Sequence, residues 1–214
     1  MKNNKRKQFL LIILIILIAV FSIQYMMTKA NAENKTIVAV VLPKGNDMDY
    51  SRVLDGIRDY AMNHDVLLDV WYRDSISPRE LQELIVDEEK NDAIGVLLVY
   101  PEVYIKGDAN EIYDYDHVLA VTDTMTKNFS HTATFEECSK VVYPVPIASE
   151  VLVSIKEDQE RVIYIKNTYK LGYCSIQQME QYAQGGSMDD ICLNCMKVDG
   201  TTIVNGDIDS LLTE

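Results

Sequence analysis

From Lys35 onward, short apolar runs alternate with segments in which apolar residues recur at helical spacing. The apolar runs are rich in β-branched residues, as is typical of buried parallel strands, and they cover residues 36–42, 66–72, 94–100, 118–122 and 161–165. Helical spacing covers residues 50–61, 77–85, 148–156 and 168–184. This alternation predicts an α/β fold with a doubly wound, parallel, Rossmann-like sheet.

Local signals place some of the helix ends. Residues 77–80 have Ser at the N-cap, Pro in the first turn and Glu three positions on, which predicts a helix start. The core face of that helix is expected to hold Leu81, Leu84 and Ile85. We expect Asp49 to cap the preceding helix and Gly185-Gly186 to end the last one.

The pattern is looser outside these segments. Residues 109–115 are expected to form a short polar helix, and residues 141–146 either an edge strand or a crossing segment. Residues 201–205 are expected to be extended.

Composition narrows the class of protein. Apolar residues make up 48% and charged residues 25% of the 214, as in a globular protein rather than a disordered chain. With 33 acidic and 20 basic residues, the net charge is −13. A nucleic-acid-binding face needs clustered Lys and Arg, so this balance argues against nucleic acid as a partner.

The N-terminus has the features of a targeting segment. Basic residues at 2–7 precede an uncharged, almost wholly apolar run at 9–23, and Ala30-Asn31-Ala32 fits the small-x-small cleavage rule. Residues 1–32 are therefore either a cleaved signal peptide or an uncleaved membrane anchor, whose apolar stretch, 9–27, approaches the length that spans a bilayer. Both alternatives predict an exported, extracytoplasmic protein, secreted or membrane-anchored. Removal of residues 1–32, which hold five basic residues and no acidic one, takes the net charge from −13 to −18.

Several stretches resemble type I periplasmic sugar-binding proteins, the substrate-binding proteins of sugar ABC transporters. They are VAVVLPKGNDMDYSRVLDGIRDYA, which contains the family's G-x-x-x-x-A helix motif, then AIGVLLVYPE, VLAVTDT, and VIYIKNTYKLGY with the glycines that end its helix. In the family, the last of these crosses back to complete the N-terminal lobe. The resemblance implies a periplasmic-binding-protein-like lobe preceded by the N-terminal signal or transmembrane helix.

The chain departs from the family in one interval. Family members carry a whole second lobe between the fourth strand and the returning strand, whereas residues 125–160 alone fill that interval here. The resemblance therefore implies a single lobe. Its expected parts are the main lobe (35–124 and 161–186), a shortened replacement of the second lobe (125–160) and a C-terminal tail (187–214).

Ligands of doubly wound sheets bind at the carboxyl ends of the strands. The polar and aromatic residues expected there are Asn46, Asp47, Asp49, Tyr50, Tyr100, Glu102, Asp123, Thr124, Lys166 and Asn167. The resemblance implies that Asp123 matches the family's sugar-binding acid and that Tyr50 stands near its stacking aromatic. Lys166 and Asn167 replace a Gln and an Asp of the family's motif. Loops of this fold are polar in any case, and Tyr50 also suits the first core position of its helix.

The cysteines allow several interpretations. Cys192 and Cys195 form a CxxC that an oxidising compartment would favour as a disulfide; free buried thiols are the alternative. Zinc would need Cys138 and Cys174 as further ligands, so one CxxC is weak evidence for a metal. The sequence has no G-x-S-x-G elbow, G-x-G-x-x-G or P-loop. We therefore expect no enzyme activity, no cofactor and no metal.

Two functions follow as expectations. The first is binding of a small polar ligand, with a sugar as the expected kind, for uptake through an ABC permease or for presentation to a sensor kinase ectodomain. The alternative is an interaction domain that has lost its ligand and docks on a transporter, a sensor kinase ectodomain or a second copy of itself. Convergence of Tyr50, Asp123 and Asn167 on one open pocket would favour the first.

Overall fold

The computed structural model describes residues 36–45, 50–106, 113–123, 128–143, 147, 149–158 and 161–204. From residue 36 onward the chain forms one compact unit. The expected signal peptide or membrane anchor, residues 1–32, lies outside the described residues. None of the helices in the described part is long and apolar enough to cross a membrane.

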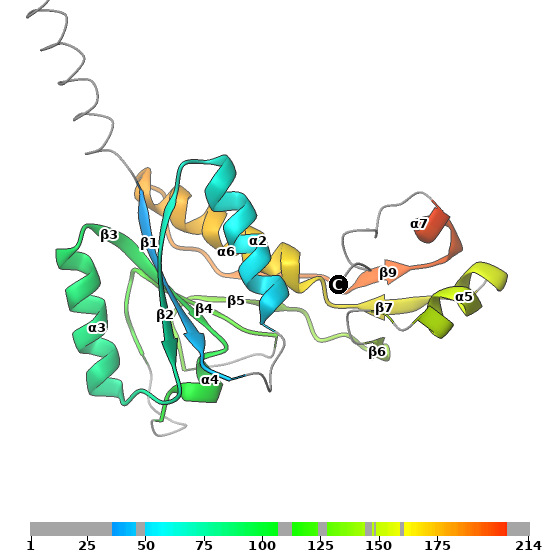
Figure 1. The fold of residues 1–214 in the computed structure, drawn as a ribbon, viewed down its shortest axis with the longest axis horizontal. Helices are drawn as coiled ribbons and strands as arrows, with labels where there is room; N and C mark the ends of the chain where they lie inside the picture. The colour runs from blue at the N-terminus through cyan, green and yellow to red at the C-terminus, as the bar shows by residue number, and fades with distance from the viewer. Residues whose placement is uncertain are drawn as a thin grey trace, which may run out of the picture. The chain divides into compact units, whose positions relative to one another are not determined.

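Six strands form the first sheet, in the order β2-β1-β3-β4-β5-β8, and every neighbouring pair in it is parallel (Figure 1). The strands are β1 (Ile37–Pro43), β2 (Leu67–Arg73), β3 (Ala93–Val99), β4 (Val118–Val121), β5 (Thr132–Phe135) and β8 (Ile191–Leu193). This arrangement confirms the predicted α/β fold with a doubly wound parallel sheet.

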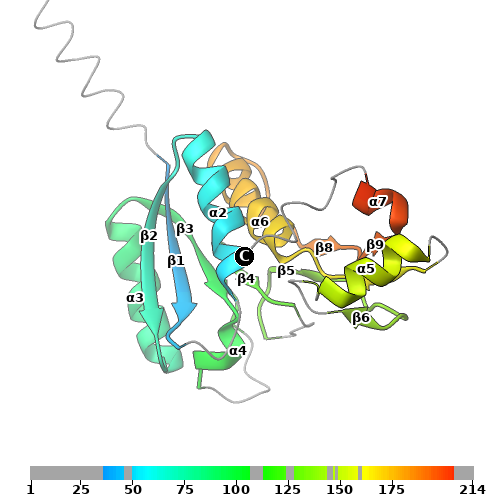
Figure 2. The ribbon, with the colours of Figure 1, turned by 45° about the vertical axis from the view of Figure 1, so that its right-hand side comes forward.

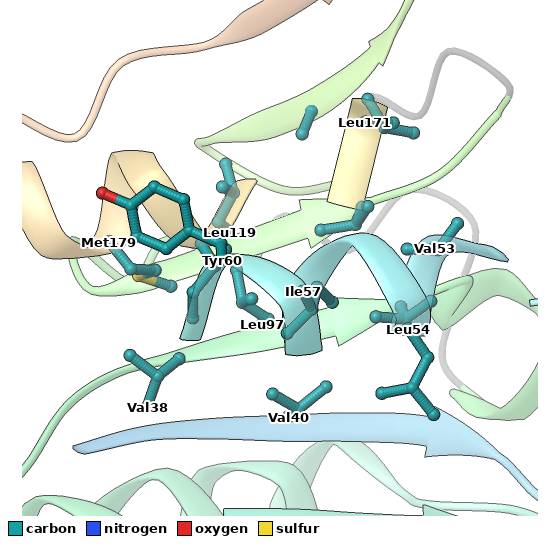
Figure 3. Close-up of a cluster of buried hydrophobic side chains, with 14 of the residues drawn as sticks. Val38, Val40, Val53, Leu54, Ile57, Tyr60, Leu97, Leu119, Leu171 and Met179 are labelled. Carbon is teal, nitrogen blue, oxygen red and sulfur yellow. The ribbon is translucent and has the colours of Figure 1, made fainter. Parts of the chain in front are cut away.

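Helices cover both faces of the first sheet. On one face, α2 (Ser51–Asn63) and α6 (Thr168–Ala183) lie side by side (Figure 2). The other face is covered by α3 (Pro78–Lys90) and the single-turn helix α4 (Pro101–Tyr104). Side chains alternate along each strand, so Val38, Val40 and Leu42 of β1 face α2 and α6 (Figure 3), whereas Ala39 and Val41 face α3. Burial on both faces explains the continuous apolar runs in the sequence.

Helices α2 and α6 pack with their backbones in close approach. A Cβ atom on Gly56 of α2 would stand 2.0 Å from the carbonyl oxygen of Tyr169, and one on Gly172 of α6 would stand 2.0 Å from that of Val53. Each helix therefore needs glycine at the crossing. Gly56 opens the G-x-x-x-x-A motif of the sequence, so the motif has a packing reason in this chain.

The predicted helix ends are partly confirmed. Ser77 and Glu80 form a capping box at the start of α3, and Leu81, Leu84 and Ile85 are buried as expected. The N-cap of α2 is Tyr50, whose side chain makes no capping hydrogen bond; the expected cap, Asp49, lies outside the described residues. Helix α6 ends just before Gly185, which has a φ of +91°.

A second, smaller sheet has the order β6-β7-β9. Its strands are β6 (Val142–Tyr143), β7 (Ile163–Ile165) and β9 (Met196–Val198), with β6 and β7 parallel and β9 antiparallel to β7. Helices α5 (Ser149–Glu157) and α7 (Gly200–Val204) accompany it (Figure 1). Its core consists of Ile147, Ile155, Ile163, Ile165, Val198 and Ile203.

The structure corrects the expected places of several segments. The strand at 161–165 was expected in the main sheet, but β7 pairs with β6 and β9; β5 and β8 complete the first sheet instead. Residues 201–204 are helical rather than extended, because the Asp199 carboxylate accepts hydrogen bonds from two backbone N–H groups at the start of α7. Residues 113–115 are not helical, and Tyr113 forms a β-bridge with Phe129.

Within the described residues, the chain passes between the two sheets three times. We call these passages the crossing segments: residues 136–141 between β5 and β6, 166–167 between β7 and α6, and 194–195 between β8 and β9. They begin where β5, β7 and β8 end. The second sheet is therefore built from two parts of the chain, β6 to β7 and β9 to α7. The first and third crossing segments lead into it, and the second leads back to the first sheet.

Candidate functional site

Polar side chains gather where β3 and β4 end and the crossing segments begin. Glu102 follows β3, Thr122 and Asp123 follow β4, and Lys166 follows β7. We call these four residues the edge cluster. It lies at the carboxyl edge of the first sheet, where doubly wound folds place their ligands.

A buried hydroxyl holds the first carboxylate of the edge cluster. Thr122 is fully buried, and its Oγ1 donates a hydrogen bond to Oε1 of Glu102 at 2.8 Å. Glu102 is exposed as a whole residue, but its carboxyl group turns toward this buried hydroxyl. Partial removal of the carboxyl from water raises the pKa of Glu102, and the negative charge of Asp123 adds to this shift.

Tyr100 sets the direction in which the chain leaves β3. It has a φ of +50°, in the left-handed region that non-glycine residues rarely adopt, and its N–H donates to the carbonyl oxygen of Val121. Its side chain is 3% exposed and belongs to the core between the first sheet and α2. The strained backbone turns the chain into α4, which brings Glu102 beside Thr122.

Lys166 reaches from the second sheet to the end of the first. Its Nζ donates to the backbone oxygen of Asp123 and lies 5.6 Å from the ring centroid of Phe135 on β5. Lys166 binds the backbone of Asp123 and not its side chain. The Asp123 carboxylate has no hydrogen-bond partner among the described residues. The carboxyl groups of Glu102 and Asp123 thus act on each other at the end of the first sheet, and the ammonium group of Lys166 binds the Asp123 backbone beside them.

The structure brings some of the expected site residues together and gives others structural tasks. Asp123 and Lys166 meet, as described. Asn167 caps α6, since its Oδ1 accepts from the N–H of Lys170 at 2.9 Å, and Tyr50 packs half-buried against the core. Tyr100 is buried in that same core. Asn46, Asp47, Asp49 and Thr124 lie outside the described residues.

Sequence reasoning missed Thr122 and Phe135. Thr122 stands at the end of an apolar run, where a polar residue before an acid was an available signal. Phe135 belongs to a strand whose TATF sequence has no apolar run, so nothing local marked it.

The cysteines and the acidic groups offer no ready metal site. Among the residues that the structure describes, no group of three or more His, Cys, Asp or Glu side chains could hold a metal ion. All four cysteines are free. Burial and, after it, the side chain of Cys138, on a different crossing segment, raise the pKa of the Cys195 thiol.

Comparison with known proteins gives structural matches only. The chain matches no protein-family model and no curated protein sequence. An ABC transporter solute-binding protein of Bacillus halodurans, with bound myo-inositol, is 8% identical; the match covers 80% of this chain and 96% of that one, with a TM-score of 0.42. The periplasmic ribose ABC transporter protein of Conexibacter woesei is 11% identical, covers 82% and 95%, and gives 0.44. The lac repressor is 6% identical, covers 82% and 83%, and gives 0.45.

Two of these neighbours are named as proteins of ABC transport systems and one as a repressor. In this chain the first sheet and its helices form the predicted α/β layers, and a second sheet of three strands accompanies them. At this level of similarity, any argument about ligands rests on the residues of this chain.

Proposed function

We propose that the protein binds a small polyhydroxylated ligand, sugar-like in its chemistry, outside the cytoplasm, for ABC-type uptake or for presentation to a membrane sensor. The observation that carries the proposal is the edge cluster at the carboxyl edge of the first sheet. Its carboxylates accept hydrogen bonds from hydroxyl groups, and the ammonium group of Lys166 donates them.

The electrostatics of the edge cluster support a polar, uncharged ligand. The Glu102 carboxyl is partly removed from water beside a second acid, which is a costly arrangement for stability alone. Hydroxyl groups would donate to both carboxyls without adding negative charge, whereas an anionic ligand would meet repulsion from Glu102 and Asp123. Strained Tyr100 at the same edge fits the tendency of binding sites to store backbone strain.

The location outside the cytoplasm is supported by the N-terminal sequence. A basic segment, an apolar run and a small-x-small site follow one another in residues 1–32. The choice between a secreted and an anchored protein, and between a permease and a sensor kinase ectodomain as partner, is part of the proposal and calls for experiments on cells.

Thermal unfolding of the purified chain with myo-inositol, ribose, glucose and galactose tests the proposal. A ligand that binds only the folded state adds about 2.7 kcal/mol at a hundredfold excess over its dissociation constant, so the midpoint rises. We expect the rise to be lost in Asp123→Asn. The matched control is Asp116→Asn, which makes the same change at an exposed position before the amino end of β4.

A cooperative transition whose midpoint no probe moves would contradict ligand binding. The interaction-domain alternative would then gain, and a partner search would follow. A rise that persists in Asp123→Asn would mean that the ligand binds away from the edge cluster.

A further inference from the structure

Two of the crossing segments run beside each other and each carries a cysteine. Strands β5 and β8 are parallel, with Phe135 opposite Leu193, and the N–H of Glu136 continues the ladder by donating to the carbonyl oxygen of Leu193. Cys138 and Cys195 follow directly on these two strands. The two cysteines therefore lie on neighbouring segments, just beyond the ends of β5 and β8.

The backbone spacing suits a disulfide between them. Cys138 comes two residues after Glu136, and Cys195 comes two residues after Leu193, the two residues joined by that hydrogen bond. Both cysteines lie beyond the ends of the strands, so the alternation of side chains along a strand does not fix where they point. Neighbouring strands lie about 4.8 Å apart, within the Cα–Cα range of about 4.4–6.8 Å that a disulfide bridges. Both cysteines are partly buried, and the Cys138 side chain, after burial, raises the pKa of the Cys195 thiol.

The CxxC pair has the opposite geometry. Cys192 lies inside β8 and Cys195 just before β9, on a segment that runs from one strand into the other. A disulfide within a CxxC needs a turn between the two cysteines, whereas here the segment leads from a strand of the first sheet directly into a strand of the second. Cys192 is also exposed and pairs in register with Thr134, whereas Cys195 is partly buried beside Cys138.

We propose that Cys138 and Cys195 form a disulfide that ties the first and third crossing segments together, and that Cys192 stays outside it. The oxidant is a disulfide donor, either a small oxidised thiol or the oxidised form of a thiol–disulfide oxidoreductase. The thiolate of one cysteine attacks a donor sulfur, which forms a mixed disulfide and releases one donor thiol. The other cysteine then displaces the second donor thiol. The pair loses two electrons and two protons, and the donor gains them as two thiols.

The surroundings of the pair predict that its oxidation by the donor is slow near neutral pH, because the attacking form is the thiolate. Burial, followed by the hydrogen bond with Cys138, raises the pKa of Cys195 to about 11, so this thiol stays protonated near neutral pH. The bond would close a loop that contains all of β6, α5, β7, α6 and β8. It would therefore fix the second sheet to the first by a covalent link.

Disulfide mapping of the full-length chain tests the proposal. The purified protein is reduced, freed of reductant and incubated with oxidised glutathione; remaining thiols are then blocked with iodoacetamide, and the peptides are analysed by mass spectrometry. We expect Cys138 joined to Cys195, with Cys192 blocked. Because Cys174, Cys192 and Cys195 share one tryptic peptide, the variants Cys174→Ser and Cys192→Ser are mapped as well, and a cross-link that persists in both identifies Cys195 as the partner of Cys138. The oxidised form should also unfold at a higher temperature than the reduced form.

Two outcomes would overturn the proposal. One is a Cys192–Cys195 bond as the main product, and the other is a chain whose four cysteines remain blocked or carry glutathione. The mapping on the wild-type chain needs no substitution, so it stands even if Cys138→Ser fails to fold. Where that variant folds, its unfolding temperature should no longer respond to oxidation, whereas that of Cys192→Ser should respond as the wild type does.

Discussion

The two sheets differ in how the chain builds them. In the first, β1 to β4 follow one another along the chain and alternate with helices, and β1, β3 and β4 are buried on both faces. In the second, three strands of two or three residues come from parts of the chain separated by α5 and by α6 with β8, and the core holds six buried residues. Local pattern is therefore enough for β1 to β4, whereas the second sheet depends on contacts distant in sequence, whose loop closure costs entropy.

Truncating one core side chain in each sheet should separate them most clearly. Leu97 on β3 and Ile155 on α5 are both fully buried, so each change to Ala should cost about 2–5 kcal/mol where it acts. We expect Leu97→Ala to lower the stability of the whole chain. Ile155→Ala should open the second sheet locally and leave the first folded, because only a small core holds the second sheet together.

Native-state hydrogen exchange measures both effects. In Ile155→Ala, amides of β6, β7 and β9 should exchange faster while those of β1 and β3 stay protected. Equal loss of protection in both sheets would show that they unfold as one cooperative unit, and the contrast between them would then fail as an energetic statement.

The contrast also explains what the sequence allowed to be predicted. The first four strands and the starts of α2 and α3 were predicted nearly to the residue, because a buried parallel strand leaves an apolar run and Ser77 leaves a capping box. Helix α4 was not predicted, and the helix expected at 109–115 is contradicted at residues 113–115. Strand β5 was missed because its two threonines interrupt the apolar pattern. The run at 161–165 was identified as a strand, but no local signal tells which sheet a strand joins, and its place was predicted wrongly.

For the candidate site, the positions of its residues along the chain could be predicted, but their contacts could not. Asp123 and Lys166 follow strands, so their position at the carboxyl edge was foreseeable. Their meeting was not, because Lys166 reaches Asp123 from a strand of the other sheet. The capping bond of Asn167 is local, and its Asn-Thr-Tyr-Lys sequence was available as a helix-start signal.

Substitution at the α2–α6 crossing tests how tightly the first sheet is covered. Gly172→Ala should cost about 1–3 kcal/mol, because the new Cβ would overlap the carbonyl oxygen of Val53 and push the helices apart. The control is Gly45→Ala, where φ is +136° and the new Cβ meets nothing within 4 Å, so only backbone strain applies. Denaturant unfolding should rank Gly172→Ala as the more harmful. The reverse order would mean that the two helices can move apart at little cost.

Asn167 lies on the segment that leads from β7 of the second sheet into α6, which covers the first sheet. Because its role is to cap α6, we expect its loss to cost less stability than the change at Gly172. Asn167→Ala removes the acceptor for the Lys170 N–H and should cost about 1 kcal/mol. Asn167→Asp keeps an acceptor there and adds a charge that the helix N-terminus favours, so its stability should match or exceed that of the wild type. Urea unfolding of the two variants checks this. Equal losses in both would show that the amide group, and not the cap, is what matters.

Substitution of Glu102 should change the stability least, and it should raise the stability rather than lower it. Its pKa is raised in the folded state, so the folded protein holds this proton more tightly than the unfolded chain does. The resulting penalty is absent below the unfolded-state pKa and grows as the pH rises through the folded-state value. Glu102→Gln removes the charge and keeps an oxygen that accepts from Thr122. At pH 7 the variant should therefore be more stable than the wild type, by no more than about 0.5 kcal/mol.

Thermal unfolding between pH 4 and pH 7.5 should show this advantage fading as the pH falls, while an exposed control, Glu137→Gln, shows no such trend. The same variant should weaken the midpoint shift caused by any ligand that binds at the edge cluster. A gain in stability together with a loss of binding is expected of a carboxyl kept at a cost for its task. If Glu102→Gln were less stable at pH 7, the charged carboxylate would be stabilising the junction of the two sheets. Its purpose would then be structural, as that of Asn167 is at the start of α6.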